Sequence, residues 1–234
     1  MGYGYYYYFD PTYLLIILGV LLSVIASAHV TGTYRKYAQV RSRCGMTGAQ
    51  VAQEILRRNG IYDVMVQHVG GDLTDHFDPR SKTVRLSDTV YGSTSVAALG
   101  VAAHECGHVV QNATGYVPLR LRTALVPVAN FGTNAGFWIA MIGLILGFSQ
   151  TFVMVGIVLF SAGVIFQLVT LPVEFNASHR ALKMLEEYGL LGRDEVADSR
   201  KVLTAAALTY VAAALSSMLQ LLRLILLSSR RNDR

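Results

Sequence analysis

The pentapeptide His104-Glu105-Cys106-Gly107-His108 carries the clearest chemical signal in the sequence. Residues four apart share one face of a helix, so the imidazoles of His104 and His108 lie close enough to bind one metal ion. Zinc suits such a site because it lowers the pKa of water towards neutrality. The carboxylate of Glu105, between the two histidines, can accept a proton from that water. The motif therefore predicts two zinc ligands and a catalytic base for hydrolysis of peptide bonds.

A helix with two incidental histidines is the alternative interpretation of this motif. The surrounding sequence, VAALGVAAHECGHVVQ, favours the metal site because it predicts an apolar helix, and β-rich runs precede it. Gly107 lowers helix propensity, but a residue without a side chain leaves room beside a metal ion.

A catalytic zinc ion usually has three protein ligands and one open position, so a third ligand is required. Glu174 is the best candidate, because it ends an apolar run where an unpaired charge is costly. An interfacial glutamate paired with an arginine is the alternative, and His179 is the competing ligand. Ser178 lies four residues after Glu174 and shares its helical face, so it can form a hydrogen bond to a ligand.

The composition indicates a membrane protein. Of 234 residues, 53% are hydrophobic and only 15% are charged, well below the charged fraction of soluble domains. Four apolar runs approach or exceed the roughly 20 residues that cross a bilayer. They are residues 13–30, 124–148, 151–173 and 203–227. We therefore expect a mainly α integral membrane protein with about four membrane helices and a small metallopeptidase domain that contains a short β element.

These runs divide the chain into five expected segments: an N-terminal anchor helix (1–30), a membrane-face domain with the HECGH helix (31–123), a two-span hairpin (124–173), a helical segment with the third ligand (174–202), and a C-terminal apolar helix with a basic tail (203–234). The hairpin returns the chain to its starting side of the membrane. It therefore places Glu174 on the same membrane face as the two histidines.

Local patterns predict the elements of the membrane-face domain. Thr47-Gly-Ala-Gln50 is a capping box that begins a helix, and Gly60 ends it. Residues 64–69 and 82–87 are β-rich runs separated by turn residues, which predicts a pair of strands linked by a loop. A helix is expected from about Ser95 to Gln111.

The distribution of charge predicts the topology. The first eleven residues, MGYGYYYYFDP, lack Lys and Arg, whereas Arg35, Lys36, Arg41 and Arg43 follow the first apolar run. The positive-inside rule then places the N-terminus outside and the HECGH segment in the cytoplasm. The tyrosine cluster fits an interfacial aromatic belt, with a functionless tail as the alternative. The net charge of +5 is explained by these flanking segments rather than by nucleic-acid binding.

The last apolar run, residues 203–227, leaves two alternatives open. A simple crossing places Arg230, Arg231 and Arg234 outside, against the charge rule. A re-entrant or interfacial helix that ends in the cytosol removes this conflict. The two cysteines, Cys44 and Cys106, are expected to be reduced thiols, since two residues make no disulfide framework.

Seven segments spread over nearly the whole sequence form a specific pattern: FDPTY, GMTG, LTDHFDP, RLS, VAAHECGHVVQ, LPVEFNASHRAL and LTYVAAAL. Through these segments the chain resembles the bacterial family of membrane neutral zinc metallopeptidases. More distantly, HECGH followed by Glu174 resembles membrane stress-response and CAAX prenyl proteases, in which a Glu begins an E-x-x-A-D motif. This resemblance implies a gluzincin-like site of His104, His108 and Glu174 with Glu105 as base. Ser178 departs from the pattern, because those relatives usually carry Asp there.

The same resemblance implies that an edge strand before the zinc helix pairs with extended substrate, which makes residues 82–87 the candidate. His76 and Asp78 are candidates for lining the cleft, although turn residues that stabilise a loop are the favoured interpretation. His179 and Arg180 are candidates for stabilising the transition state.

The sequence thus predicts a zinc metalloendopeptidase in the bacterial cell membrane, with one Zn²⁺ per chain. Its expected substrates are proteins or peptides in or near the lipid bilayer. We expect no binding of nucleic acid. A non-catalytic scaffold or adaptor with a structural zinc site is the first alternative. A transporter or channel subunit that uses Glu174 as an intramembrane charge is the second. The sequence leaves open whether the protein forms a larger membrane complex or a homo-oligomer.

Overall fold

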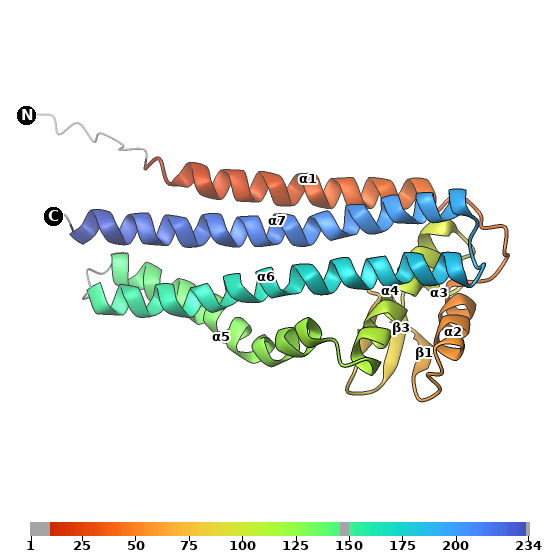
Figure 1. The fold of residues 1–234 in the computed structure, drawn as a ribbon. Coiled ribbons are helices and arrows are strands. Elements are labelled where there is room, and N and C mark those ends of the chain that lie inside the picture. The colour runs from red at the N-terminus through yellow and green to blue at the C-terminus, as the bar shows by residue number, and fades with distance from the viewer. Residues whose placement is uncertain (1–9, 146–149, 233–234) are drawn as a thin grey trace, which may run out of the picture. The chain divides into compact units, whose positions relative to one another are not determined.

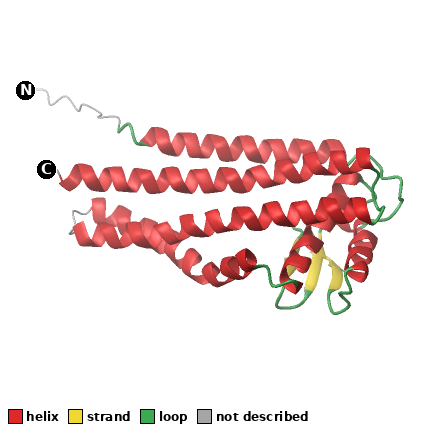
Figure 2. Cartoon of the chain, viewed as in Figure 1, coloured by secondary structure: helices red, strands yellow, loops and turns green. Residues whose placement is uncertain are grey.

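The computed structural model describes residues 10–145 and 150–232. The fold is mainly helical with a small sheet (Figures 1 and 2), as the sequence predicts. The described elements are α1 (Tyr13–Tyr37), α2 (Gly48–Arg58), β1 (Met65–His68), β2 (His76–Asp78), β3 (Thr83–Leu86), α3 (Asp88–Tyr91), α4 (Val96–Ala113), α5 (Val117–Ile145), α6 (Gln150–Glu187) and α7 (Arg193–Asn232).

Four of these helices, α1, α5, α6 and α7, are long and apolar enough to cross a membrane. The predicted run 203–227 lies inside α7, which continues without interruption from Arg193 to Asn232. A re-entrant turn within this stretch is therefore excluded. The tyrosines within residues 1–9, residues 146–149 of the predicted two-span hairpin, and Arg234 lie outside the described residues.

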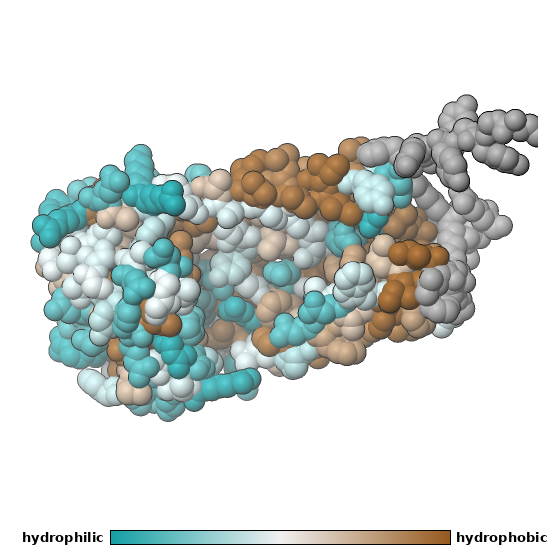
Figure 3. Space-filling model, turned by 180° about the vertical axis from the view of Figure 1, so that it is seen from behind, coloured by the Kyte–Doolittle hydropathy of each residue, from teal (hydrophilic) through white to brown (hydrophobic). Residues whose placement is uncertain are grey.

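Large apolar side chains cover the outer surface of α1. Leu14, Ile17, Val20, Leu21 and Val24 each expose more than half of their surface, and Figure 3 shows this helix as a hydrophobic area. A soluble monomer rarely exposes such a continuous apolar surface. A hydrocarbon environment explains it, because lipid removes the cost of exposing these side chains to water.

The chain forms two compact units. The first comprises residues 1–24, 125–167 and 212–234, and the second comprises residues 25–124 and 168–211. In the first unit, α5 and α6 pack closely through small residues: a Cβ on Gly136 would lie 2.5 Å from the backbone nitrogen of Phe160. Small residues let membrane helices approach in this way. Every predicted site residue belongs to the second unit.

The core of the second unit contains α2 and α4. The predicted capping box is confirmed: Gln50 N donates to Thr47 Oγ1, and Thr47 N donates to Gln50 Oε1. Val51 and Ile55 of α2 are fully buried, as is Leu99 of α4. Gly60 follows the helix with a φ of 70°, a left-handed conformation that favours glycine.

The sheet of the second unit has three strands in the order β1-β3-β2. β1 runs parallel to β3, and β2 runs antiparallel to it. Our prediction that residues 82–87 form an edge strand was wrong, because β3 is the central strand. The reason is β2, whose three residues, His76–Asp78, are too few to show a period-two pattern in the sequence. The edges of the sheet are β1 and β2.

The predicted HECGH helix is α4, and its N-cap Ser95 accepts a hydrogen bond from Ala98 N. Gly107 lets α4 approach α6, since a Cβ there would lie 2.5 Å from the carbonyl oxygen of Ala177. The missing side chain thus makes room for the backbone of α6. Gly100 similarly faces Ser199 of α7, whose hydroxyl donates to Val96 O at 2.7 Å. The contact at Gly107 thus positions α4 against α6, the helix that carries Glu174, and the contact at Gly100 positions it against α7.

Candidate metal centre

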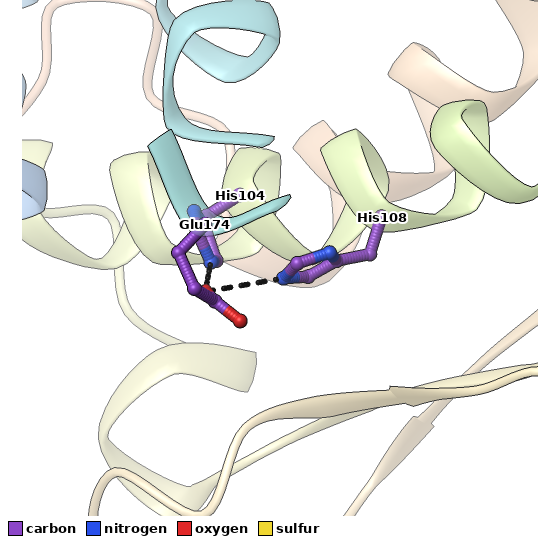
Figure 4. Close-up of side chains that lie close together, drawn as sticks. All are labelled: His104, His108 and Glu174. Atoms are coloured by element: carbon purple, nitrogen blue, oxygen red, sulfur yellow. Dashed lines mark ion pairs between the residues drawn. The ribbon is translucent and has the colours of Figure 1, made fainter. Parts of the chain in front are cut away.

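His104 and His108 of α4 point towards the carboxylate of Glu174 on α6 (Figure 4). Glu174 Oε2 lies 3.3 Å from Nε2 of His104 and 3.5 Å from Nε2 of His108. Among the described residues, these three form the group of potential ligands that could hold a metal ion, and their ligand atoms lie within 4.8 Å of one another. Two segments 66 residues apart in the sequence thus meet.

The distances fit a zinc ion. Zinc ligands at about 2.1 Å on a tetrahedron are separated by about 3.4 Å, close to the two distances from Glu174 Oε2. This oxygen is buried and has no hydrogen-bond partner within residues 10–145 and 150–232. A buried carboxylate oxygen without a partner is costly, and a cation between it and the imidazoles removes that cost.

Hydrogen bonds orient both imidazoles through their other nitrogen. His104 Nδ1 lies 3.1 Å from Ser178 Oγ, and His108 Nδ1 lies 3.0 Å from Gln111 Oε1. The side chain of Gln111 is fixed in turn by two hydrogen bonds. Its Nε2 donates to Val173 O at 2.8 Å and to Asn176 Oδ1 at 3.0 Å. With Nδ1 occupied in this way, Nε2 of each ring faces Glu174 and is available to a metal ion.

The second oxygen of Glu174 contacts an arginine. Arg122 Nη1 on α5 lies 3.1 Å from Glu174 Oε1. Glu174 is only 2% exposed, so this cation offsets part of the cost of burying the carboxylate. The alternative role of Glu174, a glutamate paired with arginine, therefore uses one oxygen and leaves the other for the histidines.

A cavity opens beside this group. Glu105 lines it together with His104 and Glu174, so the expected base and two expected ligands share one space. The remaining wall is largely apolar but includes Asp75 and Tyr210. An apolar cavity with a few convergent polar groups is the usual form of a substrate site.

Electrostatics in this region favour a cation. Burial acts to lower the pKa of His108, but the carboxylates of Glu174 and Glu105 outweigh it, and the pKa lies above its ordinary value. Burial raises the pKa of Asp75, and hydrogen bonds from Ser87 N and Oγ oppose this.

The other predicted residues lie elsewhere. His179 is exposed, and Arg180 donates to Asn176 Oδ1 at 2.8 Å; neither lines the cavity. Asp78 accepts hydrogen bonds from Arg80 N and Ser81 Oγ, which is the behaviour of a turn residue. His76 is exposed and lies beside Thr74 O.

Four residues that contact or line this site were not predicted from the sequence: Asp75, Gln111, Arg122 and Tyr210. Gln111 had a usable signal, since a residue three positions after a histidine on a helix can reach its ring. Arg122 also had one, as a charge beside an apolar run. Asp75 and Tyr210 had none, because only the tertiary fold brings them to the cavity.

An HExxH helix joined by a carboxylate from a second helix is the donor set of zinc metallopeptidases, and here it occurs in a chain with four potential membrane helices. The chain belongs to the family described as "Putative neutral zinc metallopeptidase", whose model matches residues 12–229. It is 46% identical over 219 residues to "Putative membrane protease YugP" of Bacillus subtilis (strain 168), covering 94% of this chain and 97% of that protein. No solved structure matches the chain significantly.

Proposed function

We propose that this protein is a membrane-embedded zinc metalloendopeptidase that cleaves membrane or membrane-proximal proteins. The observation that carries the proposal is Glu174 Oε2, a buried oxygen without a hydrogen-bond partner among the described residues that faces Nε2 of both His104 and His108. The family and the relative's name support protease activity. We further propose that the site faces the cytoplasm of a bacterial cell, following the positive-inside rule.

In this proposal, His104, His108 and Glu174 would hold one zinc ion. Ser178 and Gln111 orient the two imidazoles through Nδ1. Ser178 thus does for His104 what an aspartate is expected to do in the more distant relatives. Partners of this kind typically contribute tenfold or more to metal affinity.

Bound zinc supplies Lewis acidity, which polarises a carbonyl and lowers the pKa of water. Glu105 accepts the proton of the attacking water and then donates it to the leaving amine. Its place on the cavity wall beside His104 supports this role. The phenol of Tyr210 lines the same cavity and is the proposed hydrogen-bond donor to the charge that develops on the carbonyl oxygen. Tyr210 takes the place of His179 and Arg180 in this role.

The outer edge of β2 is the proposed place for an extended substrate. β2 is an edge strand, and Asp75, directly before it, lines the cavity with His104 and Glu105. Unpaired backbone groups of an edge strand can pair with a peptide in extended conformation. A substrate bound there lies next to the proposed catalytic groups.

A scaffold with a structural zinc ion is the alternative function. Structural zinc sites usually have four protein ligands and are closed. Here three ligands adjoin a cavity that also contains a carboxylate suited to act as a base. This difference favours catalysis.

Metal analysis of the purified protein tests the zinc site. We expect about one zinc ion per chain, lost in Glu174→Gln and retained in Glu186→Gln, a matched change at an exposed position on the same helix. Absence of zinc after growth with added zinc contradicts the proposal. Equal zinc content in both variants removes Glu174 as a ligand.

A further inference from the structure

A second groove in the same unit is lined by basic and hydroxyl side chains. Its walls are one face of α1, with residues at spacings of four and three, and one face of α7. The lining residues are His29, Thr33, Lys36, Tyr37, Arg200, Lys201, Thr204 and Ala205. None of them lines the cavity beside Glu174, so this groove is separate from the candidate metal centre.

Two of the cations of the groove lie near one aromatic ring. The ammonium groups of Lys36 and Lys201 lie 5.3 and 5.4 Å from the ring centroid of Tyr37. Tyr37 is buried, and cation–π attraction to its ring favours the presence of both ammonium groups in this groove. Because like charges repel, this arrangement is suited to a ligand that carries negative charge.

The groove has more positive than negative charge. Lys201 Nζ pairs with Asp198 at 2.8 Å, whereas Lys36 and Arg200 have no carboxylate within ion-pair distance among the described residues. Among the residues that the structure describes, no acidic side chain lines the groove itself. Two cations therefore remain available to an anion, and the hydroxyls of Thr33 and Thr204 add hydrogen-bond donors.

The groove lies just beyond the apolar surface of both helices. Ile25 is the last large exposed apolar residue of α1, and His29 follows one helical turn later. On α7, Leu208 is the first such residue and comes one turn after Thr204. One turn corresponds to about 5.4 Å. If the apolar surfaces contact hydrocarbon, the groove is at the depth of lipid head groups.

We propose that this groove binds the phosphate of an anionic phospholipid head group. Juxtamembrane cations attract anionic lipids, and helix pairs form pockets for their head groups. The bound lipid bridges α1 to α7. Val30 of α1 and Leu203 of α7 line the candidate substrate cavity, so the lipid stabilises two of its walls.

The test is the affinity of the full chain for phosphatidylglycerol, measured by native mass spectrometry in neutral detergent. The groove variant Lys36→Gln/Arg200→Gln/Lys201→Gln removes three charges. At about fivefold for each of the two cations without a carboxylate partner, Lys36 and Arg200, we expect binding to be weaker by on the order of 25-fold or more. The matched control, Arg35→Gln/Arg41→Gln/Arg193→Gln, removes three exposed charges from the neighbouring parts of the chain, outside the groove. It is expected to bind within about threefold of wild type.

If the two triple variants lose the same amount of lipid affinity, binding arises from diffuse electrostatic attraction rather than from the groove. This result overturns the proposal. If millimolar inorganic phosphate displaces the bound lipid as effectively as added phosphatidylglycerol does, the groove binds a free anion. This result also overturns the proposal. Phosphatidylcholine is expected not to compete. If circular dichroism shows that the groove variant is misfolded, Lys36→Gln alone decides, with an expected loss of about fivefold.

Discussion

Arg122 and Glu174 form an ion pair that uses only one of the two carboxylate oxygens of Glu174. Arg122 Nη1 lies 3.1 Å from Oε1, while Oε2 of the same group faces the imidazoles of His104 and His108. The contact with Arg122 leaves a single oxygen for the proposed zinc ion.

Replacing Arg122 is therefore expected to weaken zinc binding. Arg122→Gln removes the charge that helps to hold Glu174, and loss of such a partner typically costs 10- to 100-fold in metal affinity. Competition with a chelator measures the zinc dissociation constant. Arg120→Gln, at an exposed position on the same helix, is the control. Equal affinity in the two variants removes Arg122 from this role, and Arg122→Lys should be intermediate because it keeps the charge.

Gly107 should tolerate no side chain. A Cβ at this position meets Ala177 O at 2.5 Å, so Gly107→Ala must separate α4 from α6. We expect a loss of roughly 1–3 kcal/mol in the free energy of unfolding, the usual cost of overpacking, together with weaker zinc binding. Gly32→Ala is the control, since nothing lies within 4 Å of a Cβ on this helical glycine. Equal stability of the two variants in denaturant titrations contradicts the close packing of α4 on α6.

Tyr210 should affect turnover more than metal content. Tyr210→Phe removes the hydroxyl from the cavity and keeps the ring. Loss of one donor to the developing oxyanion typically lowers kcat by on the order of 100-fold. Tyr116→Phe, whose ring stacks near Arg180 rather than in the cavity, is the control. An unchanged kcat with Tyr210→Phe assigns the oxyanion contact to another group.

The two thiols should differ in reactivity. Cys44 is exposed and Cys106 is buried, where its thiol donates to Ala52 O at 3.6 Å. Burial, and to a lesser degree the charge of Glu105, raises the pKa of the Cys106 thiol, so little of it is the reactive thiolate. Maleimide at pH 8 should label the folded wild type once and the folded Cys44→Ser variant hardly at all. Rapid labelling of folded Cys44→Ser shows that Cys106 is accessible.

Local patterns predicted the parts of the fold that depend on short spacings. The capping box of Thr47 and Gln50 and the helix after Ser95 are confirmed, because each depends on residues within one or two turns. The apolar runs likewise predicted four long helices. The lengths of these helices could not be predicted from apolarity alone, since α6 continues from its apolar part through Glu174 to Glu187.

Long-range contacts were less accessible from sequence. The central place of β3 depends on β2, a three-residue strand that pairs only after the chain reverses. The role of Gly107 depends on the backbone of a helix about 70 residues away. The charge of Arg122 beside an apolar run was a usable signal, but its contact with Glu174 depends on where the start of α5 lies beside α6.

The most direct test of the proposed enzyme compares zinc content and peptide hydrolysis in Glu105→Gln. Glu105 is proposed to transfer a proton and not to bind zinc. We therefore expect about one zinc ion per chain, as in wild type, and a kcat lower by a factor of about 10²–10⁴. Glu186→Gln, an exposed change, should match wild type in both measurements. Hydrolysis by Glu105→Gln at the wild-type rate would contradict the account.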